Sequence, residues 1–175
     1  MSAARSRLRR AGRGSAADGS VVTWSVAEGR RGARWREVRV RDGAIVSSLL
    51  LEIDPKGRFS HLELSTATGL LTLHPEADGT LHGNAVDASG VRHVVAVPWV
   101  PDDVLLVAGS PIARAAATPR ADAHRRSGVA MGVVVGLDLA VDRRAIGRTE
   151  RAIQLDPSGT PAFPDGVSWP LELDG

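Results

Sequence analysis

Short apolar runs alternate with turn-forming residues from Val21 onward, at intervals of about ten residues, a spacing typical of an all-β sandwich or barrel. Within most runs, apolar and polar residues also alternate, as they do when a strand has one buried and one exposed face. The pattern therefore predicts an all-β domain. The predicted strands are Val21–Ala27, Arg34–Arg41, Ala44–Ile53, Phe59–Thr66, Gly69–His74, Thr80–Val86, Val91–Pro98, Val104–Ala108, Val129–Val141, Ala145–Leu155 and Trp169–Leu173.

The turns between these strands have recognisable sequences. Asp42-Gly43 separates two predicted strands, as in a two-residue hairpin. Asp54-Pro55-Lys56-Gly57 places proline where a β-turn favours it, and Asp156-Pro157-Ser158-Gly159 repeats the arrangement. We expect an antiparallel β-barrel or a strongly curved half-barrel of about eleven strands, with one short helical turn over 112–117 that Pro119 limits.

The chain of 175 residues is long enough for one domain with a sizeable core. Residues 1–19 are Arg-rich and show no hydrophobic periodicity, so we expect a disordered tail there. Residues 20–175 are expected to form a single antiparallel β-domain, interrupted by a polar loop over Arg120–Ser127.

The composition is that of a folded, water-soluble protein. Hydrophobic residues make up 43% of the chain but aromatic residues only 3%, so aliphatic side chains must fill the core. The absence of Cys excludes disulfides and thiolate metal sites and agrees with a reducing compartment. The N-terminal segment lacks the apolar core of a secretory signal, and no uncharged apolar run approaches the ~18 residues of a membrane span. We therefore expect a cytoplasmic protein.

Positive charge comes almost entirely from arginine. The formal net charge is +2, and Lys56 is the only lysine. Nucleic-acid binding is disfavoured, because stacking aromatic residues between the basic ones are nearly missing. The Arg-rich tail instead suggests peripheral contact with an anionic membrane surface, although residues 1–19 lack the apolar stripe of an amphipathic anchor.

Histidines fall on four successive predicted strands. If short loops join these strands, His61 lies opposite His74, and His82 and His93 share the same face. Neutral imidazole is a common zinc ligand, so His61, His74 and His82 are candidate metal ligands. The favoured alternative is a polar sheet face on which His alternates with residues such as Thr72, because no HExxH motif or other tight His pair is present.

Known catalytic motifs are missing from the sequence. It contains no GxSxG, no phosphate-binding GxxxxGK[ST] and no GxGxxG after a strand. Asp102-Asp103 lies at a predicted turn, where aspartate has an ordinary structural use. The apolar, Gly-rich segment Gly128–Gly136 is typical of a closely packed strand. The sequence therefore predicts a protein that is not an enzyme and that uses no cofactor.

The four tryptophans are candidates for ligand contact. Trp24 and Trp35 lie on the first two predicted strands, Trp99 ends the seventh, and Trp169 lies in the last. Tryptophan combines a large apolar surface with one N–H donor, so it can anchor a core or line a cavity for a lipid chain or a sugar ring. The sequence leaves both interpretations open.

The order of several segments is characteristic. A Trp-bearing strand at Trp24 precedes the runs Arg34–Thr66 and Thr72–Asn84, and the Leu155–Gly159 turn precedes a closing Ser168–Glu172. In this order the chain resembles a bacterial family of domains described as glycolipid-binding, of which it would be a divergent member. The resemblance covers most of the chain after residue 20 and implies an open or closed antiparallel β-barrel whose concave face takes an amphiphile.

The counterpart of that family's central polar motif is the segment Asp103–Arg114. The resemblance makes Asp103, Ser110 and Arg114 candidate ligand-binding residues. The motif is altered here, because Leu105 stands where the family has a second Asp and no Thr-Asn-Thr follows Ser110 and its proline.

These features predict a non-enzymatic module that binds a lipid-like or glycolipid-like small molecule in the concave face of a β-barrel. The apolar runs Ser47–Ile53 and Gly132–Val141 would form the cavity wall. One alternative is a structural or protein-interaction β-domain with a filled core and no ligand. Another is a small hydrolase or isomerase that uses the His-bearing face.

Overall fold

The computed structural model describes residues 9–123 and 130–170. Within these ranges the chain forms twelve strands and two helices. The strands are β1 (Arg9–Ser15), β2 (Val21–Gly29), β3 (Gly32–Arg41), β4 (Ala44–Ile53), β5 (Phe59–Thr66), β6 (Gly69–Pro75), β7 (Thr80–Asp87), β8 (Gly90–Pro98), β9 (Val104–Val107), β10 (Ala130–Val135), β11 (Val141–Ile146) and β12 (Val167–Pro170). The helices are α1 (Pro111–Ala123) and α2 (Arg148–Arg151).

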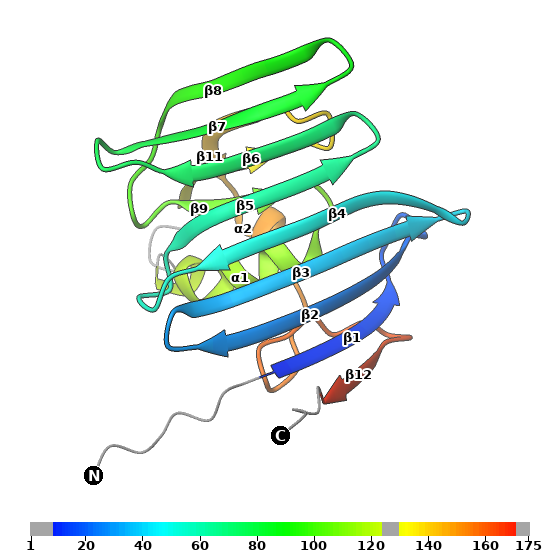
Figure 1. The fold of residues 1–175 in the computed structure, drawn as a ribbon. Helices are drawn as coiled ribbons and strands as arrows, with labels where there is room; N and C mark the ends of the chain where they lie inside the picture. The colour runs from blue at the N-terminus through cyan, green and yellow to red at the C-terminus, as the bar shows by residue number, and fades with distance from the viewer. Residues whose placement is uncertain (1–8, 124–129, 171–175) are drawn as a thin grey trace.

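The strands form two sheets. The large sheet has nine strands in the order β12-β1-β2-β3-β4-β5-β6-β7-β8, and all neighbours are antiparallel. The small sheet has the order β11-β10-β9, with β9 parallel to β10 and α1 in the connection between them. Figure 1 shows α1 and the small sheet behind the large sheet, where they cover one of its faces. We call the covered face the inner face and the opposite one the outer face.

Alternation of side chains between the two faces explains the long strands. On β7, Leu81 and Ala85 are buried on the inner face, whereas Asn84 and Val86 are exposed on the outer face. The burial pattern has the period of two that a pleated strand imposes. The predicted segments therefore coincide closely with β2 to β8.

The Asp42-Gly43 turn between β3 and β4 also follows the prediction. Both residues have positive φ, 52° for Asp42 and 78° for Gly43, and Arg41 pairs with Ala44. Positive φ at both central positions is the geometry of a type I′ turn, whose twist matches that of the flanking strands. The turn sequence thus fixes the pairing beside the turn, and an irregularity between Arg39 and Val40 shifts the register of the rest of the hairpin by one residue.

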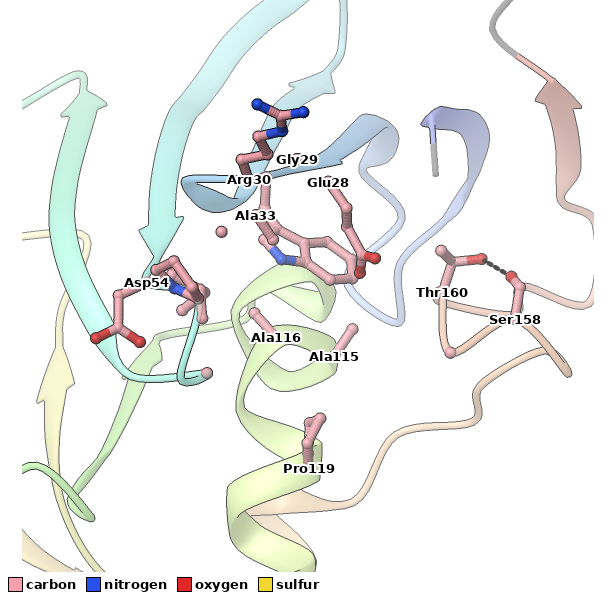
Figure 2. A pocket seen from close by; sticks show the side chains of 16 residues that line it. Glu28, Gly29, Arg30, Ala33, Asp54, Ala115, Ala116, Pro119, Ser158 and Thr160 are labelled. Atoms are coloured by element: carbon pink, nitrogen blue, oxygen red, sulfur yellow. Dashed lines mark hydrogen bonds between the residues drawn. The ribbon is translucent and has the colours of Figure 1, made fainter. Parts of the chain in front are cut away.

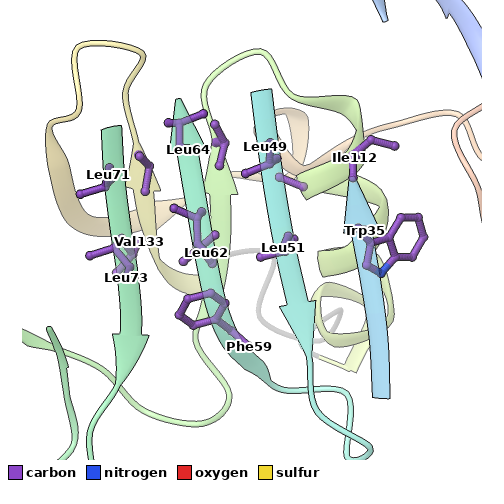
Figure 3. Close-up of a cluster of buried hydrophobic side chains, with 14 of the residues drawn as sticks. Trp35, Leu49, Leu51, Phe59, Leu62, Leu64, Leu71, Leu73, Ile112 and Val133 are labelled. Atoms are coloured by element: carbon purple, nitrogen blue, oxygen red, sulfur yellow. The ribbon is translucent and has the colours of Figure 1, made fainter. Parts of the chain in front are cut away.

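Aliphatic side chains fill the space between the inner face and its cover. Leu62, Leu64, Leu71 and Leu73 of β5 and β6 belong to one buried cluster with Val133 of β10 (Figure 3). Full burial of such a side chain stabilises the fold by about 1.5–3 kcal/mol relative to leaving it exposed. Burial of aliphatic side chains therefore holds the two layers together, as expected for a chain with few aromatic residues.

The antiparallel β class is confirmed, but the sheet does not close into a barrel, which was one of the two predicted forms beside a strongly curved half-barrel. Within the described ranges, β12 and β8 are the two edges of the large sheet and do not pair with each other. The inner face is covered by α1 and the small sheet instead, so its apolar side chains leave water without closure of the sheet. Most of the predicted cavity wall is consequently core, including Leu49 and Leu51 of β4 and Val135 of β10.

The predicted disordered tail over residues 1–19 is wrong for the part that the structure describes. Residues Arg9–Ser15 form β1, which pairs with β2 on one side and with β12 on the other. Residues 1–8 of the predicted tail lie outside the described residues.

Glycine at inward positions hides β1 from the hydrophobic pattern. Gly12 and Gly14 are buried on the inner face, opposite Trp24 and Val22 of β2. A Cβ on Gly12 would lie 2.4 Å from the Trp24 ring, and a Cβ on Gly14 would lie 2.2 Å from the Phe163 ring. Aromatic rings from elsewhere fill the places that β1's own side chains would take, so the strand carries no apolar alternation.

The helix is longer than the predicted turn over 112–117. α1 continues through Pro119 to Ala123, so Pro119 does not end it and the first part of the predicted loop Arg120–Ser127 is helical. Buried contacts of Ile112 and Ala113 with the main core hold the helix in place and outweigh the cost of an internal proline. Residues 124–127 of that loop lie outside the described residues. No helix in the described ranges is both long enough and apolar enough to cross a membrane.

Strand prediction fails over the C-terminal third of the chain. The predicted strand Val129–Val141 divides into β10, a turn closed by a Gly136 N–H to Ala140 carbonyl bond of 2.9 Å, and β11. The predicted strand Ala145–Leu155 contains only the end of β11 and then α2. The last strand is Val167–Pro170 rather than Trp169–Leu173, whose final residues lie outside the described part.

Replacing Gly12 with Val tests whether β1 is an integral strand. The new side chain would displace the Trp24 ring, so we expect Gly12→Val to lower the free energy of unfolding by about 1–3 kcal/mol, as overpacking of a core does. Urea unfolding measures this value. Ala11→Val is the matched control, because Ala11 is the next residue on β1 and faces outward. Equal stabilities of the two variants would contradict the position of β1.

Candidate ligand-binding cavity

A cavity of about 680 Å³ lies at one end of the inner face, between two hairpins of the large sheet and α1. We call it the hairpin–helix cavity. Figure 2 shows Glu28 and Arg30 of the β2–β3 hairpin above it, and Ala115 and Ala116 of α1 facing it from below. The β4–β5 turn and the segment Ser158–Thr160 form the remaining sides. The cavity exists because the helix and the small sheet cover the inner face incompletely.

Trp35 provides the apolar surface where the core meets the cavity. Its side chain is 7% exposed, belongs to the main buried cluster and also lines the cavity. It is paired with Leu51 on β4, and alternation brings Ile53, two residues further along, to the same wall. Of the seven candidate ligand-binding residues, Trp35 is the one that the structure places in this cavity.

Two Asp-Pro-x-Gly turns lie on opposite sides of the cavity, and each is stabilised by its own aspartate. Asp54 accepts hydrogen bonds from the backbone N–H groups of Lys56 and Arg58 and from the Arg58 guanidinium. Asp156 accepts them from the N–H and hydroxyl groups of Ser158 and Thr160. The sequence predicts both turns, but not that they border one cavity.

The two aspartates are poor candidates for proton transfer. Burial alone would raise the pKa of Asp156, but the hydrogen bonds from Ser158 and Thr160 outweigh it and lower the pKa. Asp54 behaves in the same way, with burial opposed by the bonds from Arg58 and Lys56. Both carboxylates are therefore ionised and occupied within their turns, and they shape the cavity rather than act in it.

The α1 wall of the cavity is made of small residues. Ala115, Ala116 and Pro119 line it, so the helix presents methyl groups and a proline ring rather than long side chains. Proline has no N–H, and the Ala115 carbonyl, four residues before Pro119, lacks the helical donor that it would otherwise have. A hydrogen-bond acceptor thus lies beside an apolar wall.

The N-terminus of α1 is held against the sheet by a buried carboxyl group. Glu37 of β3 is 2% exposed and accepts hydrogen bonds from the Ser110 hydroxyl (2.8 Å) and the Ile112 N–H (3.2 Å). The Ser110 hydroxyl also accepts a bond from the Ala113 N–H. Burial raises the pKa of Glu37, although the bonds from Ser110 and Ile112 and the charge of Arg39 oppose it. Glu37 therefore fixes the helix that forms one cavity wall.

A second buried polar group follows Glu37 on β3. Arg39 forms a 2.6 Å ion pair with Asp18, donates to Ser20 and reaches the Ala108 carbonyl. Sequence reasoning missed both Glu37 and Arg39. The signal was present, because a register that turns Trp35 inward on β3 must turn Glu37 and Arg39 inward as well.

Three of the four candidate tryptophans do not line the hairpin–helix cavity. Trp24 is in the core and borders a separate cavity of about 160 Å³. Trp99 is buried and packs edge-to-face on Phe59, with ring centres 5.5 Å apart. Trp169 lies on β12 and is 43% exposed. The first two have the packing role that the sequence left open.

The polar candidates from the altered motif have structural roles. Asp103 is buried, accepts the Val100 N–H and forms a 3.0 Å ion pair with Arg143 of β11. Ser110 directly precedes α1 and donates a hydrogen bond to Glu37. Arg114 lies on α1 within electrostatic range of Glu150 of α2 and does not line the cavity. The segment Asp103–Arg114 therefore builds the cover of the inner face.

The four histidines of the described strands lie on the outer face in nearly the predicted register. His74 is paired directly with His82, and His93 with Asn84. His61 and His74 contact separate partners at 3.0 Å, Glu63 and Glu76 respectively. Within the described residues, no group of three or more His, Cys, Asp or Glu side chains is suited to a metal ion. The arrangement is that of a polar sheet face.

Comparisons with protein-family models, with curated proteins and with solved structures find no match for this chain.

Glu37→Gln tests the buried carboxyl group through pH. A raised pKa means that Glu37 keeps its proton to a higher pH in the folded state than in the unfolded chain. The free energy of unfolding therefore falls as pH rises from about 4.3 toward the raised value. Gln keeps an acceptor but cannot ionise. We expect Glu37→Gln to gain stability relative to the wild type across that interval, by at most about 1.4 kcal/mol per pH unit.

Urea unfolding at a series of pH values measures this difference, and Glu37→Leu is the control. Leu leaves the Ser110 hydroxyl and the Ile112 N–H without their acceptor, which costs about 1–3 kcal/mol at every pH. If the wild type and Glu37→Gln show parallel pH curves, the pKa of Glu37 is not raised.

Proposed function

We propose that this domain binds a small amphiphilic molecule of the glycolipid type in the hairpin–helix cavity, without changing it chemically. The observation that carries the proposal is the cavity itself, with an apolar interior of Trp35, Ile53, Ala115 and Ala116 and polar groups around it. Apolar pockets with a few polar groups are the usual sites for small ligands.

The size of the cavity supports this proposal. Small-molecule sites are about 300–1,000 Å³, and the hairpin–helix cavity of about 680 Å³ lies within this range. Each methylene group moved from water into such a site contributes about 0.8 kcal/mol. A short alkyl chain against Trp35 and the α1 alanines would therefore contribute most of the affinity.

The polar groups suggest where the head group of the ligand would lie. Glu28 and Arg30 are exposed on the β2–β3 hairpin at the edge of the cavity (Figure 2). Carboxylate and guanidinium groups pair well with the hydroxyl groups of a sugar, and Trp35 offers a flat ring for stacking. The resemblance to glycolipid-binding domains favours the same class of ligand.

The proposed ligand occupies one end of the sheet rather than its whole concave side. α1 and the small sheet fill the inner face over β5 to β8, where Leu62, Leu64, Leu71 and Leu73 are fully buried. This filled region is also the observation that favours the alternative, a structural or protein-interaction domain without a ligand. A titration with small amphiphilic ligands decides between the two functions.

Octyl glucoside, methyl glucoside and octanoate are suitable probes, because the second lacks the chain and the third lacks the sugar. We expect saturable binding of octyl glucoside below its micelle concentration by isothermal titration calorimetry, and weaker binding of the other two. Ala116→Phe should fill the cavity and weaken octyl glucoside binding tenfold or more, which corresponds to about 1.4 kcal/mol.

Ala88→Phe is the control, because Ala88 is exposed in the β7–β8 turn, away from the cavity. Thermal unfolding confirms that both variants fold. Failure of the wild type to bind any of the three probes, or equal affinities of the two Phe variants, would exclude the proposed site and leave the structural alternative.

A further inference from the structure

The outer face carries an exposed tryptophan at the β12 edge of the large sheet. Trp169 pairs with Ala11 of β1, and Val167 pairs with Arg13. All four side chains point outward, because the intervening Gly12 faces Trp24 in the core. Trp169 is 43% and Val167 55% exposed, whereas Trp24, Trp35 and Trp99 are at most 7% exposed.

Arginines surround this apolar edge. Arg9 and Arg13 flank Ala11 on the outward side of β1, and Arg36 follows in the same cross-strand row, through Ser25 of β2. All three arginines are exposed. We define the basic tryptophan patch as these three arginines together with Val167 and Trp169.

Acidic groups near the patch already have partners. Glu52 of the outer face forms a 2.6 Å ion pair with Arg34, and Asp165 accepts hydrogen bonds from the N–H and hydroxyl groups of Ser15. Within the described residues, Arg9, Arg13 and Arg36 form no ion pair. With Asp165 counted as −1 and the Arg34–Glu52 pair as neutral, the patch has a clear positive excess.

We propose that the basic tryptophan patch docks on the surface of an anionic lipid bilayer. Tryptophan favours the interface between head groups and acyl chains, and arginine is attracted to the negative potential of anionic lipids. Nucleic acid is a poorer occupant, because base stacking requires several aromatic platforms and the patch has one. The proposal replaces contact through a disordered tail with contact through a folded strand, and it does not depend on the cavity.

Sedimentation of the full chain with vesicles tests the proposal. We expect binding to phosphatidylcholine–phosphatidylglycerol vesicles, weakened by salt, and little binding to pure phosphatidylcholine vesicles. Arg9→Gln with Arg13→Gln should weaken binding by about tenfold or more, and Arg9→Lys with Arg13→Lys should largely preserve it. Trp169→Thr should weaken binding by several-fold and abolish any blue shift of the tryptophan emission on vesicle addition.

Arg31→Gln with Arg92→Gln is the charge-matched control, because both residues are exposed outside the patch. Residues 1–8 stay unchanged in every variant. Equal losses in the control and in the Arg9, Arg13 variant would show attraction by net charge alone and overturn the proposal. Failure of the wild type to sediment with anionic vesicles would also overturn it. The same holds if the wild type binds a single-stranded oligonucleotide instead of vesicles and the Arg9, Arg13 variant loses that oligonucleotide binding.

Vesicle binding and octyl glucoside binding can be lost separately, so the two proposals are tested independently. Ala116→Phe should bind vesicles like the wild type, and Trp169→Thr should bind octyl glucoside like the wild type, because Ala116 and Trp169 lie on opposite sides of the large sheet. A loss of both activities in either variant, with thermal unfolding unchanged, would mean that the patch and the cavity are not separate sites.

Discussion

The inner face of the large sheet is apolar and has to be covered, and the rest of the structure depends on how this is done. The cover is made of α1 and the small sheet, which meet the leucines of β4 to β6 in one continuous core. The cover ends before the sheet does. At this boundary Trp35 belongs to the core and also lines the hairpin–helix cavity, so the proposed site is a direct result of incomplete coverage.

Polar groups on the inner face make this arrangement specific. A purely apolar helix could slide over a leucine surface, but Glu37 accepts bonds from Ser110 and from the first turn of α1 and so fixes its position. Arg39 and Asp18 anchor the adjacent loop in a similar way. Glu37 and the cavity-lining Trp35 lie two residues apart on β3, so the strand that forms the cavity floor also places the helix that forms its wall.

The sequence predicts the hairpins well because their signals are local. Strict alternation and turns such as Asp42-Gly43 act within a few residues, and β2 to β8 appear where expected. β1 was missed because its inward positions are glycines that depend on distant aromatic rings. The length of α1 and the meeting of the Asp54 and Asp156 turns also depend on contacts between distant segments, which a local pattern does not contain. Hence one of the seven candidate ligand-binding residues, Trp35, lies in the cavity.

The order of strands in the large sheet has a consequence for folding. Within β1 to β8, each strand pairs with the strand that precedes or follows it in the sequence, so seven hairpins can close through short loops. Pairing of β12 with β1 joins residues about 160 positions apart and requires closure of a very long loop, which is slow. We expect hydrogen exchange during refolding to protect the β2–β8 amides first and those of β12 last. The outer edge around Trp169 would then be the final part of the surface to assemble.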